Sequence, residues 1–469
     1  MKKLRIGIVG IVQNNFTGNK QKNFDRGIEK INQMSKKLDF DIWAYDKLIV
    51  TNDDALVFKN EAKDKEIDLL ILMFASFGSG EIMTFLLNSA PYLGLWALDE
   101  PNKDGVLAFN SFCGVNMYAA NLKHYYRTVA PLHKWFYGVS EMFEKRLQVT
   151  VCALRAIKNM KGAKVGLIGG IVPGFNDLYF DERLIREKLG IEISRNNEMD
   201  DIISLANSYK DSDLKNEIDI VTNGYNSINE KVLNDIEKNA RFYKAFMEWS
   251  NKREFEAVAI ACWPKLQDKC DMLACSTIAK LNENGLPAAC EGDLIGAVSM
   301  LILKYATLST TMLMDLVAFD TNDESVQMWH CGPAANCFAN EEGSCLDCFY
   351  EQQGETLNRR NGMHNMTFAA SEATVMRITD ECEKMFLANG KFNPNKPTYF
   401  GSGGWLSNLE IAGEKTNSLN FVETVLTNGI PHHFPIVFGD VTDVMLEIGA
   451  WLNIKTEEIV TYKDNLQNK

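Results

Sequence analysis

The spacing of apolar and polar residues predicts that the chain begins with alternating strands and helices. Short apolar runs indicate buried strands, and the segments between them carry apolar residues at helical spacing. The predicted strands are 4–9, 41–45 and 67–74, and the predicted helices are 25–38, 54–65 and 140–160. Such alternation is typical of a doubly wound α/β domain with a parallel sheet.

A second unit of the same kind is expected after Lys161. The strand-like run 164–170 ends in a glycine turn, and further strands are predicted at 256–262 and 288–291. The glycines lack the G-x-G-x-x-G spacing of a dinucleotide site, so a tight turn that lines a cleft is the favoured interpretation. The sequence thus predicts two tandem doubly wound α/β domains.

The character of the chain changes after about residue 340. Glycine turns and short β-branched runs dominate as far as Val441, and the segment 443–452 has the spacing of a helix. We expect a mostly β C-terminal domain, either a small barrel or a sandwich. The predicted domains are 1–160, 161–340 and 341–469.

Composition and charge exclude several classes of partner. The 469 residues carry a formal net charge of −13 and show no basic footprint, so nucleic acid is not expected. No apolar run approaches the length of a membrane span, and the N-terminus lacks the pattern of a signal peptide. We therefore expect a cytoplasmic protein without a membrane partner.

The eleven cysteines are expected to be reduced in such a compartment. Four of them cluster along the sequence, at Cys331, Cys337, Cys345 and Cys348. The CxxC spacing of Cys345 and Cys348 allows a structural zinc or redox site. The alternative interpretation is that these are loop cysteines near the active site.

Two carboxylates flank a strongly apolar stretch. Glu291 follows the predicted strand at 288–291, and Asp315 comes 24 residues later, after a helix-like run. Ionised carboxylates at such places are costly unless they are paired or bound to a metal. Glu291 could also cap the helix that follows it, and Asp293 is expected to orient the turn or a ligand.

Histidines are scarce, so any imidazole ligand must come from a short list. The six are at positions 124, 133, 330, 364, 432 and 433. His432 and His433 directly precede a strand-like run, which can hold an imidazole rigidly at the edge of a pocket. His330 is the third candidate.

These residues together resemble the L-fucose isomerase family and its L-arabinose isomerase relatives. The resemblance rests on the pattern Ala-Cys-Glu-x-Asp-x-x-Gly-Ala at 289–297, the following Asp315, and a late His before an apolar strand and Gly. It implies that Glu291, Asp315 and His433 bind a divalent cation, Mn²⁺ or else Mg²⁺ or Co²⁺. The two carboxylates would also act as acid and base between an aldose and its ketose, through a cis-enediol.

The resemblance has further implications. His433 is preferred to His432 because its six-residue step to Gly439 fits the fucose isomerase pattern. His330 matches a further histidine of the arabinose isomerases, as a fourth ligand or a sugar contact. A barrel is implied for the third domain, and so is a homo-oligomer, a trimer or hexamer, in which a neighbouring subunit closes the pocket.

A monosaccharide is the expected substrate, but the sequence does not name it. Polar and aromatic residues expected to contact the sugar are Gln13, Asn14, Trp96, Trp263 and Trp405, each of which has an alternative role in packing or turns. The chain lacks the basic N-terminal loop of the fucose isomerases. This leaves two alternatives open, an isomerase of a sulfonated or acidic sugar and a sugar-binding protein without catalysis.

Overall fold

The computed structural model describes residues 1–348, 362–379 and 382–467. These residues form two compact units, Met1–Lys158 and Asn159–Lys469. The first unit ends near the predicted boundary at residue 160. The further division at residue 340 lies inside the second unit and stays a prediction.

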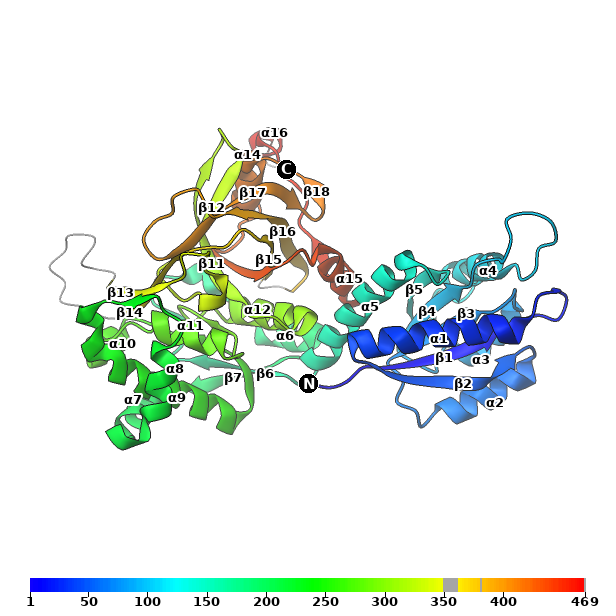
Figure 1. The fold of residues 1–469 in the computed structure, drawn as a ribbon, viewed down its shortest axis with the longest axis horizontal. Helices are drawn as coiled ribbons and strands as arrows, with labels where there is room; N and C mark the ends of the chain where they lie inside the picture. The colour runs from blue at the N-terminus through cyan, green and yellow to red at the C-terminus, as the bar shows by residue number, and fades with distance from the viewer. Residues whose placement is uncertain (349–361, 380–381, 468–469) are drawn as a thin grey trace. The chain divides into compact units, whose positions relative to one another are not determined.

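The first unit is an α/β layer structure around one parallel sheet with the strand order β2-β1-β3-β4-β5 (Figure 1). Every residue of β3 is buried, because helices cover both faces of the sheet. The strands are β1 (Arg5–Ile11), β2 (Asp41–Ile49), β3 (Leu69–Phe74), β4 (Tyr92–Ala97) and β5 (Leu132–Tyr137). The helices are α1 (Lys20–Leu38), α2 (Asn52–Ala62), α3 (Met83–Leu86), α4 (Ser111–His124) and α5 (Glu141–Met160).

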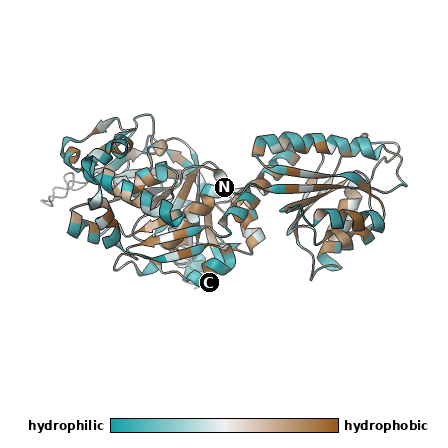
Figure 2. Ribbon diagram, turned by 90° about the horizontal axis from the view of Figure 1, so that it is seen from below, coloured by the Kyte–Doolittle hydropathy of each residue, from teal (hydrophilic) through white to brown (hydrophobic). Residues whose placement is uncertain are grey.

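Local sequence explains where these elements begin. The hydroxyl of the N-cap Thr51 accepts a hydrogen bond from the Asp54 backbone N–H, and the Thr51 backbone N–H donates to the Asp54 carboxylate, a capping box that starts α2. Hydrophobic residues lie along the strands and the inner helix faces, while hydrophilic residues cover the outer faces (Figure 2). None of the described helices is long and apolar enough to cross a membrane.

The second unit begins with a smaller parallel sheet of order β10-β9-β6-β7. Its strands are β6 (Lys164–Ile168), β7 (Glu192–Asn197), β9 (Phe255–Ile260) and β10 (Ala288–Ala289). Its helices are α6 (Glu182–Leu189), α7 (Met199–Ser208), α8 (Lys215–Thr222), α9 (Ile236–Arg253), α10 (Lys265–Cys270), α11 (Cys275–Glu283) and α12 (Leu294–Thr307). The short β10 brings the chain to Glu291.

The rest of the second unit is built on a closed antiparallel barrel. Each strand pairs with the next in the order β16-β15-β19-β11-β12-β17, and β17 pairs back with β16. These strands are β11 (Met312–Asp320), β12 (Ser325–His330), β15 (Glu372–Ile378), β16 (Lys384–Asn393), β17 (Ser402–Ile411) and β19 (His433–Phe438). Closure leaves the barrel without an open edge between these strands.

Short strands and three helices extend this barrel. They are β8 (Ser227–Ile228), β13 (Cys345–Cys348), β14 (Gly362–Thr367), β18 (Glu414–Lys415), β20 (Lys455–Thr456), α14 (Ser418–Thr427), α15 (Thr442–Leu452) and α16 (Tyr462–Leu466). A core of buried aromatic and aliphatic side chains, among them Phe386, Phe421 and Phe434, stabilises it. The predicted fold class, parallel α/β sheets followed by a mostly β barrel, is confirmed.

One placement differs from the sequence prediction. Asp315 was expected in the central α/β domain, but it lies on β11, which belongs to the barrel. The reason is long-range pairing, since β11 lies between β12 and the late strand β19. The strands that pair with β11 are distant in the sequence, so local apolar spacing did not assign this segment to the barrel.

Candidate active site

Glu291 is held where the parallel strands of the second unit end. Its carbonyl oxygen accepts a hydrogen bond from Val172, and the next residue, Gly292, donates to Ile260 at the end of β9. Gly292 has φ +74°, and a Cβ there would lie 2.1 Å from the Gly170 carbonyl oxygen. Glu291 itself has φ 61°, a conformation that costs of order 1 kcal/mol and recurs at functional sites.

Asp315 and His433 come from neighbouring barrel strands. Asp315 on β11 is the register partner of His433 on β19. Directly paired residues of antiparallel strands project to the same face, so the two side chains meet. His330 ends β12, the strand on the other side of β11, where Asp315 pairs with the adjacent Trp329.

The helix α12 connects the two sources of site residues. Its buried side chains contact β9 of the parallel sheet as well as β15 and β19 of the barrel (Figure 1). Asp293 is its N-cap and accepts a hydrogen bond of 2.8 Å from the Gly296 backbone N–H. The capping role considered for Glu291 therefore belongs to Asp293, and the Glu291 side chain is left for the site.

Four of the predicted residues converge. His433 Nε2 lies 3.2 Å from a carboxylate oxygen of Glu291 and 3.6 Å from one of Asp315. A carboxylate oxygen of Asp315 and ring nitrogens of His330 and His433 all lie within 4.8 Å of one another. The three predicted metal ligands, Glu291, Asp315 and His433, thus lie together with His330, the possible fourth ligand.

Several polar atoms of this cluster lack the partners that burial normally requires. Asp315 Oδ1, His330 Nε2 and His433 Nε2 are buried and make no hydrogen bond among the described residues. A buried polar atom without a partner costs about 1–3 kcal/mol. Three such atoms at one point, beside the Glu291 carboxylate, are what a divalent cation site requires before the cation binds.

A buried ion pair fixes the orientation of His433. The Nη1 and Nη2 atoms of Arg377 donate to the Asp293 carboxylate, at 2.7 and 3.1 Å, and both side chains are buried. The same carboxylate lies 3.0 Å from His433 Nδ1, and Arg377 also donates to the His433 carbonyl oxygen at 3.1 Å. His433 Nε2 is thereby directed at the two carboxylates.

Electrostatics in the cluster favour ionised acids. Burial raises the pKa of Glu291, but His432 and His433 outweigh it and hold the pKa well below the usual range. Burial lowers the pKa of His433, yet Asp293 and then Glu291 raise it to about 10. A cation that binds His433 Nε2 must therefore displace a proton.

His432 lies at the exposed side of the same cluster. Its Nδ1 is 2.6 Å from the Asp177 carboxylate, and its Nε2 is 3.5 Å from that of Glu291. With Glu291 and His433 it forms a second group of potential metal ligands. The choice of His433 over His432 as a ligand stays a prediction.

A cavity of about 330 Å³ opens beside Glu291. Trp263, predicted as a sugar contact, lines it, with Gln267 and Met363 among the other lining residues. The Trp263 ring packs edge-on against Phe175 at 5.7 Å. The volume is at the lower end of small-molecule sites.

The other predicted sugar contacts are not among the residues that line this cavity. Trp96 is fully buried in the first unit, where it stacks on Phe143 and donates to the Gly138 carbonyl oxygen. Trp405 on β17 donates to Pro397. Gln13 and Asn14 follow β1 of the first unit, and the Gln13 backbone N–H donates to Ser76. Trp96 and Trp405 thus have packing roles.

The described cysteines of the cluster lie in different surroundings, and the CxxC prediction involves Cys348, whose side chain is not described. Cys331 lines the cavity, and its sulfur lies 3.4 Å from that of Cys275, which the sequence did not single out. Cys345 is on β13 and bonds with Ser227, and the Cys348 side chain lies outside the described residues. No group of potential metal ligands within the described ranges includes a cysteine.

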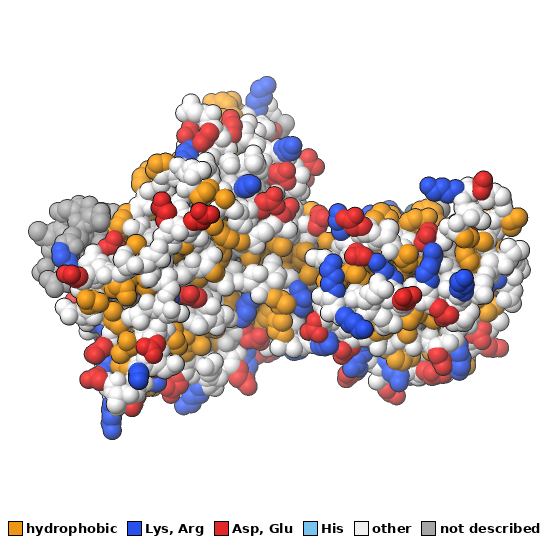
Figure 3. Space-filling view, viewed as in Figure 1, with side chains coloured by type: hydrophobic (Ala, Val, Ile, Leu, Met, Phe, Trp, Pro, Cys, Tyr) orange, Lys and Arg blue, Asp and Glu red, His pale blue; other side chains and the backbone are white. Residues whose placement is uncertain are grey.

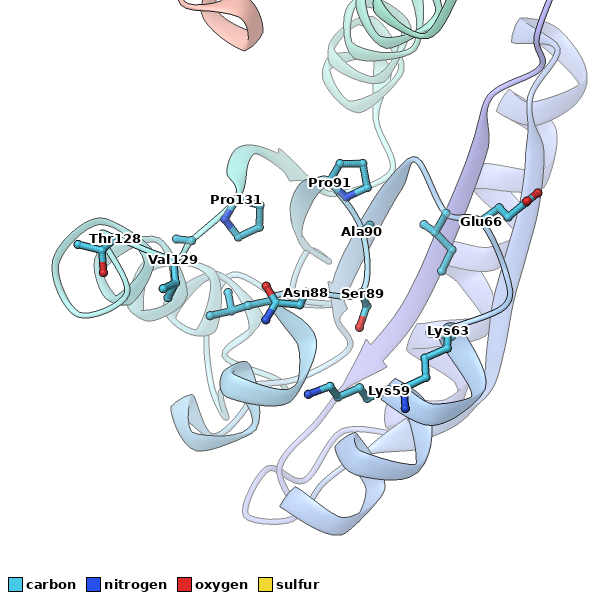
Figure 4. A pocket seen from close by; sticks show the side chains of 14 residues that line it. Lys59, Lys63, Glu66, Asn88, Ser89, Ala90, Pro91, Thr128, Val129 and Pro131 are labelled. Atoms are coloured by element: carbon cyan, nitrogen blue, oxygen red, sulfur yellow. The ribbon is translucent and has the colours of Figure 1, made fainter. Parts of the chain in front are cut away.

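A larger cavity of about 660 Å³ lies in the first unit (Figure 4). Its lining residues include Ile67, Pro91 and Pro131, which lie one or two residues before β3, β4 and β5. This is the amino-terminal edge of the parallel sheet, whereas ligands of such sheets bind at the carboxyl edge. None of the predicted site residues lines it.

On the molecular face in Figure 3, acidic and basic side chains are intermixed over both units.

Comparisons with known proteins agree with an enzyme. The chain is 25% identical over 432 residues to the sulfoquinovose isomerase of Priestia aryabhattai, covering 89% of this chain and 91% of that protein. It is 25% identical over 422 residues to that of Alkalicoccus urumqiensis, covering 88% and 90%. It is 29% identical over 223 residues to that of Clostridium sp. (strain MSTE9), covering 46% and 47%. No protein-family model matches the chain.

These similarities confirm the prediction that the chain is an isomerase. The narrower resemblance to L-fucose and L-arabinose isomerases stays a prediction. Sequence reasoning missed two residues of the site, Arg377 and Asp177, which hold the two histidines. Nothing near either residue in the sequence marks it, since both partners are far away along the chain.

Proposed function

We propose that this protein is a metal-dependent aldose–ketose isomerase whose substrate is a sulfonated monosaccharide. The observation that carries the proposal is the convergence of Glu291, Asp315 and His433, with buried atoms of Asp315 and His433 left without hydrogen bonds. Similarity over most of the chain to sulfoquinovose isomerases supports a sulfonated sugar over the unmodified sugar first expected.

Two carboxylates on different elements suit the chemistry. Isomerisation removes a proton from one sugar carbon and returns it to the next, which requires a base and an acid beside a cis-enediol. Glu291 is anchored at the end of a parallel sheet, and Asp315 at the barrel. Against the effect of burial, the two histidines hold the pKa of Glu291 low, so its carboxylate is ionised, which is the protonation state that a base must have.

The donor set fits a hard or borderline divalent cation. We propose that Glu291, Asp315 and His433 hold Mn²⁺, or else Mg²⁺ or Co²⁺, since two carboxylates and one imidazole suit these ions. A cation bound there would act as a Lewis acid toward two sugar oxygens. Asp293 and Arg377 keep the His433 ring in place for this role.

A sulfonate requires cationic or hydrogen-bonding groups beside the cavity. The described residues that line the cavity include neither Arg nor Lys. His432, beside Glu291, is the half-exposed group whose pKa is raised, against the effect of burial, by Glu291 and Asp177. We propose that it faces the substrate.

We also propose a homo-oligomer, a trimer or hexamer, which the solution mass of the purified protein tests.

A sugar panel tests the function. The purified full chain is incubated with Mn²⁺ and sulfoquinovose, glucose, L-fucose or L-arabinose, and ketose formation is followed by ¹H NMR. We expect turnover of sulfoquinovose, at least tenfold slower turnover of glucose, and loss of activity with EDTA. Tight binding of a sugar without turnover would favour the non-catalytic alternative. Full activity after exhaustive EDTA treatment would contradict the metal.

A further inference from the structure

Two of the converging histidines are stacked but differ in the partner of Nδ1. The rings of His330 and His433 are 5.5 Å apart with an angle of 27° between their planes. Both are buried, and both have an Nε2 atom without a hydrogen bond among the described residues. A neutral imidazole carries its proton on one nitrogen only, and the partner of Nδ1 determines which.

The Nδ1 atom of His433 faces an acceptor. Asp293, which is paired with Arg377 and has a pKa held well below the usual range, offers a carboxylate oxygen at 3.0 Å. A carboxylate cannot donate, so His433 Nδ1 carries the proton. In the neutral ring, the Nε2 lone pair then points at Glu291 and Asp315, as a metal ligand requires.

The Nδ1 atom of His330 faces a donor. The backbone N–H of Cys331 donates to it at 2.8 Å, and the Cys331 sulfur lies 3.2 Å away. Because a backbone N–H cannot accept a hydrogen bond, Nδ1 of the neutral His330 ring keeps its lone pair. The proton of His330 therefore lies on Nε2, the atom that has no partner in the cluster.

The backbone around His330 leaves little freedom to reverse this arrangement. His330 ends β12 in register with Ser402 of β17. Gly332 follows with φ +112°, and a Cβ there would lie 2.8 Å from the His364 backbone nitrogen. A turn of the ring that exchanged the nitrogens would leave the buried Cys331 N–H facing carbon.

From these contacts we infer that His330 is a hydrogen-bond donor and that, of the stacked pair, His433 alone binds the metal. The inference rests on the proposed function, because it divides roles within that site. His330 presents Nε2–H to oxygen atoms, those of Asp315 and of a bound sugar. This departs from the fourth-ligand role that the resemblance to arabinose isomerases allowed.

Electron spin-echo envelope modulation of Mn²⁺ bound to the full chain counts imidazole ligands. We compare the wild type with H433Q, H330Q and H330L, where Gln at 330 keeps an N–H near the position of Nε2 and Leu does not. We expect the ¹⁴N modulation of one imidazole, unchanged in both His330 variants and lost in H433Q. The Mn²⁺ Kd should change less than threefold in the His330 variants and rise at least 100-fold in H433Q.

Loss of ¹⁴N modulation, or a 100-fold weaker Kd, in both His330 variants would overturn the inference. Activity tests whether His330 donates a hydrogen bond to the substrate. H330L should lower kcat by more than 100-fold, and H330Q should lower it by clearly less. Equal activity of H330L and the wild type would overturn the donor role.

A metal-free measurement keeps this inference separate from the proposed function. Against the effect of burial, Asp315 raises the pKa of His330, so the ¹⁵N-histidine spectrum is recorded at a pH high enough to leave the ring neutral. The His330 signals, assigned by their absence in H330Q, should then show a proton on Nε2 and a bare Nδ1. An Nδ1 proton would overturn the inference even if the protein binds Mn²⁺. Failure of the wild type to bind Mn²⁺ would overturn the proposed function, while the ¹⁵N spectrum still decides the tautomer.

Discussion

The two units satisfy their polar side chains differently. In the first unit, Asn23 donates to the Ala75 carbonyl oxygen, and Glu100 accepts from the backbone N–H groups of residues 108–110. In the second unit, polar atoms of Asp315, His330 and His433 are buried without hydrogen bonds. Satisfied groups stabilise a fold, and converging unsatisfied groups indicate a ligand.

Position at a strand end does not by itself identify a site. Among the described residues of the first unit, buried side-chain atoms without hydrogen bonds belong to Arg26, Ser89 and Ser111. These residues lie on α1, after α3 and on α4. In the second unit, potential ligand atoms of Asp315, His330 and His433 lie within 4.8 Å of one another, and this convergence marks the candidate site.

The largest expected effect comes from the same substitution at one carboxylate of each unit. E291Q should lower kcat by about 10³-fold, because it removes the proposed base while keeping the shape. E100Q should leave the Mn²⁺ affinity unchanged and lower the free energy of unfolding by about 1–3 kcal/mol, because its hydrogen bonds weaken. Steady-state kinetics and urea unfolding measure both variants. Full activity of E291Q would end the assignment of Glu291.

The Arg377–Asp293 pair should be the most costly ion pair to break. R377M leaves a buried carboxylate unpaired and should lower the free energy of unfolding by about 3–5 kcal/mol. The matched change in the first unit, K158M, removes the half-exposed partner of Asp68 and should cost less than about 1 kcal/mol. If R377M and K158M lose the same free energy of unfolding in urea, burial of the Arg377–Asp293 pair does not increase its contribution to stability.

Metal binding adds a second measure of the same pair. D293N should weaken Mn²⁺ binding about 10–100-fold, since the His433 ring loses its carboxylate partner. D293N with unchanged Mn²⁺ affinity would contradict the positioning role. Isothermal titration calorimetry measures the Mn²⁺ affinity of D293N and of the wild type.

A buried histidine outside the cluster should make the second unit sensitive to acid. Burial, and then the charge of Lys280, lower the pKa of His364 to about 3. The unfolded chain takes up this proton below about pH 6.5 and the folded chain does not, so stability falls as the pH falls through that window. The loss is about 1.4 kcal/mol per pH unit. Urea unfolding between pH 6.5 and pH 5 should show a shallower slope for H364Q than for the wild type.

The smallest predicted effect lies in the first unit. T51A removes the capping box of α2 and should lower the free energy of unfolding by about 1 kcal/mol without changing Mn²⁺ affinity. T51S, which keeps the hydroxyl, is the control and should lose much less. A loss of Mn²⁺ binding in T51A would contradict the claim that this residue of the first unit affects stability alone.

Local patterns predicted the alternating strands and helices well, because buried parallel strands are short apolar runs. They also placed Glu291 at a strand end, since Ala288 and Ala289 form β10. They failed for Trp96, whose sequence neighbourhood is the same whether an indole packs in a core or faces a sugar. Exposure is a tertiary property, so no local pattern reports it.

The partners of the site residues were beyond sequence reasoning for a similar reason. Arg377 lies 84 residues from Asp293, within an apolar barrel strand where a buried guanidinium is unexpected. The pairing of Asp315 with His433 depends on the register of β11 and β19. The resemblance to known isomerases brought these two residues together, whereas apolar spacing alone would have left them apart.

Proton transfer through a carboxylate is the central claim, and deuterium incorporation tests it most directly. The Mn²⁺-loaded protein is given sulfoquinovose in D₂O, and the ketose formed is examined by ¹H NMR and mass spectrometry. Because a carboxylate exchanges its proton with solvent, we predict deuterium at C1 of the ketose and at C2 of the recovered aldose. Ketose that forms without any deuterium would indicate direct hydride transfer and contradict the account.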